Sequence, residues 1–507
     1  MKMPKLFNKV LVANRGEIAV RVLRACKTLD IKTVAVYSTA DKYAVHTLMA
    51  DEAYEIGPPP PLESYLNIDK IIEAAKLSGA DAIHPGYGFL AENSNFAQAC
   101  IDNKIAFIGP PPDAILLMGN KVESRKKMAG AGIPLIPGMK GAGKSLDEFN
   151  KVADEAGYPV LIKAAAGGGG KGMRIVKDPS ELETAVEGAK REAKSAFGDD
   201  TVYLEKYIVD PRHIEFQVFA DSYGNAVHVF ERECSIQRRH QKIVEETPSV
   251  AVTPELRKKM GEAAVAVTKA CGYVNAGTVE FLLDKSGKFY FLEMNTRIQV
   301  EHPVTEEVAG VDLVAEQIKV ASGFPLSDKF NNLTQRGHSI ECRIYAEDAG
   351  NNFMPSIGKI LLYREPTGPG VRVDSGVRQD SEIGIDYDPI MAKLIVWGED
   401  RDMAIARMVK ALKEYKILGI KHSIRYLADI VAHAIYKSSE TYTDFIDKNF
   451  ADWSDDGDNC IEMALAAAAV INANGGQKAG FGNNQQRAKA YNPWLTMGPW
   501  RLGEKIK

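Results

Sequence analysis

The chain has 507 residues, which is too long for one hydrophobic core and implies about two to four domains. Apolar residues make up 45% and charged residues 26%, as in an ordinary globular protein, and the net charge of -4 argues against a chain built to bind nucleic acid. The six cysteines are scattered without a CxxC pair, which excludes an evident zinc site or disulfide framework and fits a reducing compartment. With no signal-peptide pattern and no apolar run approaching about 18 residues, we expect a cytoplasmic protein with no membrane partner.

Strands and helices alternate through the first 109 residues. Residues 9–14 form a strand-like apolar run, Gly16 opens an amphipathic helix, and further strands are expected at 33–37, 82–84 and 105–108. This alternation predicts a doubly wound, Rossmann-like parallel sheet. The dinucleotide fingerprint GxGxxG is absent, so no cofactor is assigned there. His84-Pro-Gly-Tyr-Gly88 is interpreted as a turn, with an active-site loop as the alternative.

A phosphate-loop pattern at residues 138–145 is interpreted as a coincidence. The segment satisfies GxxxxGK[ST], but Pro134 and Pro137 interrupt the strand that should precede it. Ser145 and Glu148 have the spacing of a capping box, which predicts a helix through Ala156.

A second glycine-rich segment is a better candidate for binding phosphate. Ala166-Gly-Gly-Gly-Gly-Lys-Gly172 lies between expected strands at 159–165 and 173–176. Consecutive glycines allow close backbone approach and leave N–H groups unobstructed, so we expect a lid over a triphosphate, with Lys163 as a fixed charge beneath it. A flexible linker is the alternative.

Three full positive charges and a histidine fall between Arg238 and Lys242. Such a run is usually a nucleic-acid or nuclear-localisation patch. Because it lies between strands of an apparent catalytic domain, we interpret it as an anion site.

The next tract predicts a metal site on a hairpin. Strands at Gly277 to Leu283 and Lys288 to Met294, joined by a two-residue Ser-Gly turn, would place Glu280 opposite Glu293. Opposed carboxylates repel unless a cation lies between them, and with the amide oxygen of Asn295 they suit Mg²⁺ or Mn²⁺. A solvated hairpin is the alternative.

From His338 the pattern changes to short strands followed by amphipathic helices at 401–415 and 423–436, which predicts a separate α+β domain. Arg343 falls on one strand face with Glu341, and a strand ion pair is its plainest role. Residues 461–473 predict an Ala-rich helix, and a Gly/Asn/Gln-rich linker follows.

Taken together, these tracts resemble biotin carboxylase, an ATP-grasp enzyme, over about residues 5–450. The resemblance rests on five segments: Val12 to Ile18, His84 to Asn93, Gly167 to Met173, Gln237 to Lys242 and Glu293 to His302.

The resemblance implies a mixed α/β and α+β multidomain fold. Its expected parts are a Rossmann-like pre-ATP-grasp domain (1–120), an ATP-grasp domain (121–335) with a mobile lid at about 135–205, a biotin carboxylase C-terminal domain (336–450) and a helical, flexible tail (451–507).

It also implies a role for each residue that matches the family's motifs. ATP would be bound by Lys121, Lys163, Gly168, Gly169, Gly170, Glu205, Lys206, Ile208, His213, Gln237, His240, Glu280 and Glu293. Two Mg²⁺ or Mn²⁺ sites would use Glu280, Glu293 and Asn295. Bicarbonate would be bound by Lys242, Arg297, Gln299, Val300 and Glu301. Catalysis would involve Lys242, Arg297, Glu301 as general base, and Arg343, which would stabilise the biotin enolate.

The expected reaction is ATP- and bicarbonate-dependent carboxylation of biotin through carboxyphosphate. Met1-Lys2-Met3 matches the biotin-accepting tripeptide, but we interpret the match as chance, because no strand to form a hairpin is expected before it. The expected partners are therefore a biotin carboxyl carrier protein and a carboxyltransferase subunit, and the family implies a homodimer.

The tail segment Asn492 to Leu502 resembles acyl-CoA carboxylase α-subunits, which favours an acyl-CoA system over a pyruvate carboxylase system. Two other classes of function stay open at this point. They are a different ATP-grasp ligase that joins a carboxylate to an amine, and a non-catalytic protein that only binds ATP.

Overall fold

The computed structural model describes residues 4–139, 145–165 and 172–455. Several predictions therefore lie outside the described residues: Met1-Lys2-Met3, most of the 138–145 pattern, Gly168, Gly169 and Gly170, the 461–473 helix and the Asn492 to Leu502 tract. Within the described ranges, no helix is both long and apolar enough to cross a bilayer.

The N-terminal region is a five-stranded parallel sheet with strand order β3-β2-β1-β4-β5, which confirms the predicted doubly wound class. Its strands are β1 (Lys9–Val12), β2 (Lys32–Ser38), β3 (Glu52–Gly57), β4 (Ala82–His84) and β5 (Ala106–Phe107). Its helices are α1 (Gly16–Thr28), α2 (Val45–Met49), α3 (Ile68–Ser78) and α4 (Ser94–Asp102). The sequence did not predict β3 or α2, because β3 is a half-exposed edge strand and its Glu-Ala-Tyr-Glu pattern lacks a buried run.

One antiparallel sheet of eight strands organises the rest of the described chain, in the order β13-β12-β9-β10-β11-β14-β21-β19. Its strands are β9 (Arg212–Ala220), β10 (Ala226–Arg238), β11 (Gln241–Thr247), β12 (Asn275–Leu283), β13 (Phe289–Asn295), β14 (His338–Tyr345), β19 (Val371–Ser375) and β21 (Ile390–Gly398). The α+β region predicted from His338 is therefore not a separate sheet, since β14 pairs with β11. Sequence patterns show which residues alternate on a strand but do not show which strand it pairs with.

The β12–β13 hairpin has the predicted pairing of Glu280 with Glu293, but the predicted turn is wrong. Asp284 pairs with Lys288 across a three-residue loop, in which Gly287 has a φ of 82°. A register shift between Glu280 and Phe281 then restores the pairing. The longer loop and the register shift offset one another, so the carboxylates of Glu280 and Glu293 still lie on the same face of the hairpin.

The basic segment is itself a hairpin rather than a loop between strands. β10 runs to Arg238 and β11 starts at Gln241, so only Arg239 and His240 form the turn. Both have a positive φ, of 46° and 67°, as a tight hairpin turn requires.

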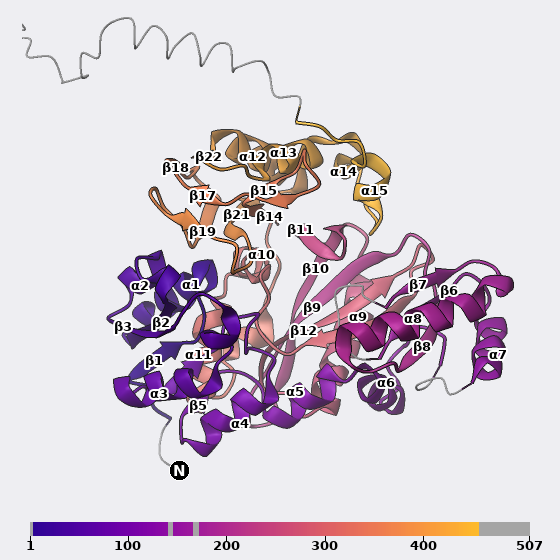
Figure 1. Ribbon diagram of the computed structural model, residues 1–507, viewed down its shortest axis with the longest axis horizontal. Coiled ribbons are helices and arrows are strands. Elements are labelled where there is room, and N and C mark those ends of the chain that lie inside the picture. Colours follow the sequence, from indigo (N-terminus) through magenta and orange to yellow (C-terminus); the bar gives the residue numbers. More distant parts are fainter. Residues whose placement is uncertain (1–3, 140–144, 166–171, 456–507) are drawn as a thin grey trace, which may run out of the picture. The chain divides into compact units, whose positions relative to one another are not determined.

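A three-stranded sheet, ordered β7-β6-β8, stands apart on the right of Figure 1 with α7 and α8. The elements are β6 (Val160–Ala164), β7 (Arg174–Val176), β8 (Val202–Lys206), α7 (Leu146–Ala156) and α8 (Leu182–Phe197). It has its own core around Phe149 and Leu204. Ser145 accepts a hydrogen bond from the Glu148 N–H at 3.3 Å, so the predicted helix cap is confirmed.

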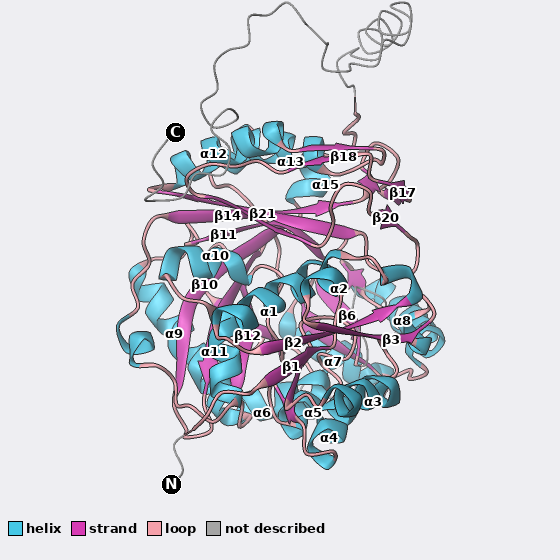
Figure 2. Cartoon of the chain, turned by 90° about the vertical axis from the view of Figure 1, so that its left-hand side faces the viewer, coloured by secondary structure: helices cyan, strands magenta, loops and turns pink. Residues whose placement is uncertain are grey.

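Helices cover both faces of the large sheet near β14 and β21, with α12 on one side and α10 on the other (Figure 2). The remaining helices are α5 (Pro112–Gly119), α6 (Lys121–Gly130), α9 (Pro254–Ala270), α10 (His302–Ala309), α11 (Leu313–Ala321), α12 (Arg401–Glu414), α13 (Ile424–Ala432), α14 (Ala434–Lys437) and α15 (Phe445–Asn449). Three two-stranded pairs complete the described part: β15 (Glu347–Asp348) with β16 (Met354–Pro355), β17 (Gly358–Lys359) with β20 (Glu382–Ile383), and β18 (Leu362–Arg364) with β22 (Lys416–Leu418). The helix predicted over 423–436 is two helices, because His433 leaves the helical conformation and caps α14.

Candidate active site

A cavity of about 1130 Å³ is lined by the N-terminal sheet, the small sheet and the large sheet. Most of the described residues that were predicted to bind ligands line it: Lys121, Lys163, Glu205, Lys206, Ile208, His213, Gln237, His240, Lys242, Glu280, Glu293, Asn295, Arg297, Gln299, Val300 and Arg343. Glu301 is the exception, since it is 0% exposed and lies behind Lys242 and Arg343. The structure thus gathers residues that lie more than 200 positions apart in the sequence.

At the end of the cavity formed by the small sheet, Lys163 on β6 lies 3.0 Å from the carboxylate of Glu205 on β8. Arg125 of α6 pairs with the other Glu205 oxygen. Burial would lower the pKa of Lys163, but the Glu205 charge raises it above its usual value, so the ammonium stays charged. Each oxygen of the Glu205 carboxylate is paired with one of these two cations. A ligand bound beside Glu205 would therefore contact the ammonium of Lys163.

Two other predicted ATP residues have different surroundings. Lys206 donates to the carbonyl oxygens of Gly157 and Tyr158, so its ammonium holds the turn that precedes β6. Lys121 lies 3.7 Å from Glu293, and both side chains are partly exposed, at 28% and 39%. This pair is loose and open to a charged ligand.

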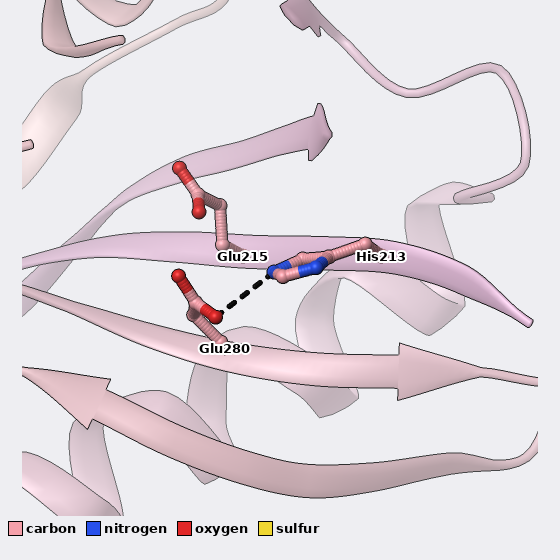
Figure 3. A group of neighbouring side chains, drawn as sticks. All are labelled: His213, Glu215 and Glu280. Atoms are coloured by element: carbon pink, nitrogen blue, oxygen red, sulfur yellow. Dashed lines mark ion pairs between the residues drawn. The ribbon is translucent and has the colours of Figure 1, made fainter. Parts of the chain in front are cut away.

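The predicted metal ligands lie along one edge of the cavity. Glu280 is 4% exposed, its Oε1 accepts from the Asn295 amide at 2.8 Å, and its Oε2 lies 3.0 Å from His213 Nε2. Figure 3 shows His213, Glu215 and Glu280 projecting toward one another from neighbouring strands. Burial would raise the pKa of Glu280, but Lys242 and His213 hold it below its usual value. The two carboxylates suit a hard divalent cation, whereas the Asn295 oxygen accepts from Arg297 in this arrangement.

Lys242 lies at the centre of three carboxylates. Its ammonium is 2.5 Å from Glu215, 2.8 Å from Glu280 and 2.8 Å from Glu301. Burial opposes the charge, but these carboxylates raise the pKa of Lys242 well above its usual value. The lysine therefore stays protonated and keeps three buried acids together.

Glu301 and Arg343 form the deepest part of the site. Arg343 Nη2 lies 2.9 Å from Glu301, and the Arg343 Nε donates to Glu245 at 2.6 Å. Burial would raise the pKa of Glu301, but Lys242 and Arg343 lower it well below its usual value. Glu301 is thus an ionised carboxylate in this arrangement.

Arg297 is held at the cavity wall by three side-chain acceptors. It donates to Glu92 at 2.9 Å, to the Gln299 side chain at 2.9 Å and to Asn295 at 3.2 Å. Glu92 also accepts from the Thr296 N–H at 3.0 Å, so the segment after β4 fixes the loop that follows β13.

Sequence reasoning missed four residues that support this site: Glu92, Glu215, Arg232 and Glu245. A signal existed for Glu215, because His213, Glu215 and Gln217 alternate along one face of a strand whose residues from Ile214 onward are otherwise apolar. No comparable signal marked Arg232, which is 0% exposed and donates to Glu215 at 2.5 Å. Of the basic segment, Lys242 reaches the three acids, whereas Arg238 pairs with Glu347 at 3.0 Å.

Three family models match successive parts of the chain. Residues 6–115 match the description "Biotin carboxylase, N-terminal domain", and residues 341–448 match "Biotin carboxylase C-terminal domain". Residues 120–329 match "Carbamoyl-phosphate synthase L chain, ATP binding domain".

Individual relatives point the same way. The chain is 57% identical over 443 residues to a pyruvate carboxylase subunit of Methanothermobacter thermautotrophicus, covering 87% of this chain and 90% of that protein. It is 49% identical over 513 residues to the α-subunit of mitochondrial methylcrotonoyl-CoA carboxylase of Dictyostelium discoideum, covering 99% and 72%. A solved structure superposes with a TM-score of 0.84 and 50% identity, covering 88% of this chain and 98% of that one. It is the biotin carboxylase domain dimer of 2-oxoglutarate carboxylase from Hydrogenobacter thermophilus, bound to MgADP, ADP and bicarbonate.

Proposed function

The chain belongs to the biotin carboxylase family, and from this premise we propose that its cavity carboxylates biotin carried by a separate protein, using ATP and bicarbonate. The fold is the family's three-domain architecture, and the activity is that of a ligase. The boundaries at 120, 335 and 450 stay predictions.

One end of the cavity binds the nucleotide. Lys121 and Lys163 neutralise phosphate charge, and the main chain around Lys206 and Ile208 faces the base. Glu280, Glu293 and Asn295 would hold Mg²⁺ or Mn²⁺, and the metal would supply positive charge that neutralises phosphate oxygens. His213, Gln237 and His240 also line this cavity, and we propose that they contact the ribose and phosphates.

The other end activates bicarbonate. Bicarbonate is a poor nucleophile, so its anion is fixed by Lys242, Arg297 and the Gln299–Val300 backbone while Glu301 accepts its proton. The freed oxygen attacks the γ-phosphorus, the bond to ADP breaks, and carboxyphosphate forms.

Arg343 serves the second step. Carboxyphosphate releases CO₂, and the phosphate that remains accepts the proton of the biotin ureido nitrogen. Negative charge then develops on the ureido oxygen, and a fixed guanidinium stabilises it before the nitrogen attacks CO₂.

The observation that carries this proposal is the convergence of Lys242 and Arg343 on buried Glu301, in one cavity with Lys121 and Lys163. An ATP-binding scaffold has no need of such a buried base, and an amine-joining ligase would hydrolyse ATP in response to an amine rather than to biotin.

The test is ATP hydrolysis measured with and without bicarbonate and free biotin. We expect hydrolysis to depend on bicarbonate and to rise with biotin, and Glu301→Gln to lower it about 10²- to 10⁴-fold with ADP affinity unchanged. Glu316→Gln is the matched control, because Glu316 is a buried glutamate of α11 that pairs with Lys329 away from the cavity. Hydrolysis indifferent to bicarbonate and to Glu301→Gln would refute the assignment.

We further propose an acyl-CoA as the final acceptor, with the chain acting as a homodimer in the cytoplasm beside a carrier protein and a carboxyltransferase. Support for the acceptor comes from the methylcrotonoyl-CoA relative, whose similarity extends over 99% of this chain and so includes the tail. The pyruvate carboxylase relative covers 87% and makes pyruvate the alternative. Carboxylation of purified carriers from each system, followed with labelled bicarbonate, distinguishes the two.

A further inference from the structure

Two N-terminal motifs meet at one buried point beside the cavity. Asn14, in the Val12 to Ile18 motif, donates to the carbonyl oxygens of Pro85 and Tyr87, at 2.7 Å each. Tyr87, in the His84 to Asn93 motif, donates its hydroxyl to Glu17. The first motif therefore fixes the loop of the second.

Glu17 connects these motifs to the large sheet. Its carboxylate lies 3.2 Å from the ammonium of Lys393 on β21. The side chains of Glu17 and Lys393 are 1% and 0% exposed, so this contact is sealed from water.

Lys393 also bonds to the site itself. Its ammonium donates to the carbonyl oxygen of Val300 at 2.8 Å. That carbonyl belongs to the peptide bond between Val300 and Glu301. The orientation of this peptide therefore fixes the position of the Glu301 Cα atom, from which the side chain projects.

The position of Lys393 in the sheet reinforces this effect. It is the direct cross-strand neighbour of Arg343, which itself lies 2.9 Å from Glu301. Glu301 is thus held from its carboxylate by Lys242 and Arg343, and from its backbone by Lys393.

Stability alone does not account for the arrangement. A buried ion pair usually stabilises a fold no better than apolar side chains of the same volume. The bond to the Val300 carbonyl, in contrast, has a direct consequence for the geometry of the base.

We propose that Lys393, with Glu17 as its counter-ion, is a positioning residue for the bicarbonate step, acting through the Val300–Glu301 peptide. The inference rests on the proposed function, and it gives the two N-terminal motifs a role in placing the general base.

The test compares Lys393→Met, the charge-balanced double variant Glu17→Gln/Lys393→Met, and Lys393→Arg, which keeps a charged donor. We expect both variants that lack the lysine to lose roughly ten- to hundredfold in kcat/KM for bicarbonate, with the KM for ATP unchanged. The double variant should recover much of the thermal midpoint lost by Lys393→Met, since the Glu17 carboxylate is no longer left without its cation, yet keep the bicarbonate defect. Lys393→Arg should recover part of kcat/KM for bicarbonate.

The matched control is Lys9→Met. Lys9 also donates to a main-chain carbonyl, that of Ser78, and pairs with a glutamate, Glu52, each at 2.6 Å and far from the cavity. We expect it to lower the thermal midpoint without changing bicarbonate kinetics.

The inference would be overturned if the double variant recovered both its thermal midpoint and its kcat/KM for bicarbonate. It would also be overturned if Lys393→Met impaired the kinetics for ATP and for bicarbonate equally. If Lys393→Met does not fold, the double variant and Lys393→Arg carry the comparison. A wild-type chain whose ATP hydrolysis ignores bicarbonate would instead refute the proposed function, and the inference with it.

Discussion

The two ends of the cavity differ in how completely their charges are paired. At the bicarbonate end, the ammonium of Lys242 lies within 2.8 Å of three buried carboxylates. Two of these carboxylates belong to strands of the eight-stranded sheet, and the third, that of Glu301, belongs to the segment after β13. At the nucleotide end, Lys121 and Glu293 are 3.7 Å apart and partly exposed. The bicarbonate end is assembled before any ligand arrives. The nucleotide end combines a buried pair, Lys163 with Glu205, and a looser pair, Lys121 with Glu293, whose charges are free to change partners.

The difference follows from the size of the ligands. Bicarbonate offers few atoms for contact, so its site has to be organised in advance. A triphosphate with its metal brings several charges, and these can draw loosely paired side chains into place. The comparison predicts that equal substitutions at the two ends have unequal effects.

The largest effect is expected from Lys242→Met, which leaves Glu215, Glu280 and Glu301 without their shared cation. Removing one member of a buried charge cluster costs about 3–5 kcal/mol, and bicarbonate-dependent hydrolysis should be abolished. Lys206→Met is the matched lysine at the nucleotide end, where the ammonium binds only two carbonyls, and it should cost about 1 kcal/mol. Urea unfolding measures the free energy of unfolding of both variants. Equal losses of stability in the two variants would contradict the proposed difference between the two ends.

An intermediate effect is expected from acid, acting on the sheet beneath the bicarbonate end. Glu246 on β11 is bonded to His338 and Arg401, at 2.7 Å each. Burial would raise its pKa, but these partners lower it from 4.5 to about 2. The stabilisation is present above about pH 4.5 and is lost as the pH falls toward 2, and it amounts to roughly 3 kcal/mol.

Urea midpoints measured from pH 6 to pH 3 test this expectation. Glu246→Gln should lower the midpoint at pH 6 and flatten its dependence on pH below about 4.5. An unchanged slope would mean that the acid sensitivity of the protein arises elsewhere.

The smallest effect on stability is expected from Lys121→Met. Its ion pair is exposed, so the free energy of unfolding should change by no more than about 0.5 kcal/mol. The KM for ATP should nevertheless rise several-fold, because a phosphate partner is lost. A fall in thermal midpoint comparable to that of Lys242→Met would show that the nucleotide end is as tightly assembled as the other.

Much of the fold was predictable because local pattern and burial agree. β4 was predicted with its observed bounds, since Ala82, Ile83 and His84 are all buried in a parallel sheet. β3 was missed because an edge strand needs no apolar run. The joining of β11 to β14 was missed because the pairing of distant strands leaves no trace in either strand's own pattern.

The candidate site was predictable in its members but not in its contacts. The pairing of Glu280 with Glu293 was correct although the turn was not, because a bulge compensated for the longer loop. Glu215 was missed although it directly faces Glu280 across the β9–β12 pair, since it lies 65 positions away in the sequence.

The sequence by itself determined the fold class, most strands and helices, and the side chains that carry charge into the cavity, because periodicity and residue type are local properties. Only the tertiary structure decided which charges neutralise one another. Lys242 is an ordinary lysine of a basic run in the sequence, and Lys393 is one lysine in an apolar strand. Their roles arise because the fold buries both ammonium groups next to specific carboxylates and carbonyl oxygens. The free energy of a buried charge depends on these surrounding groups.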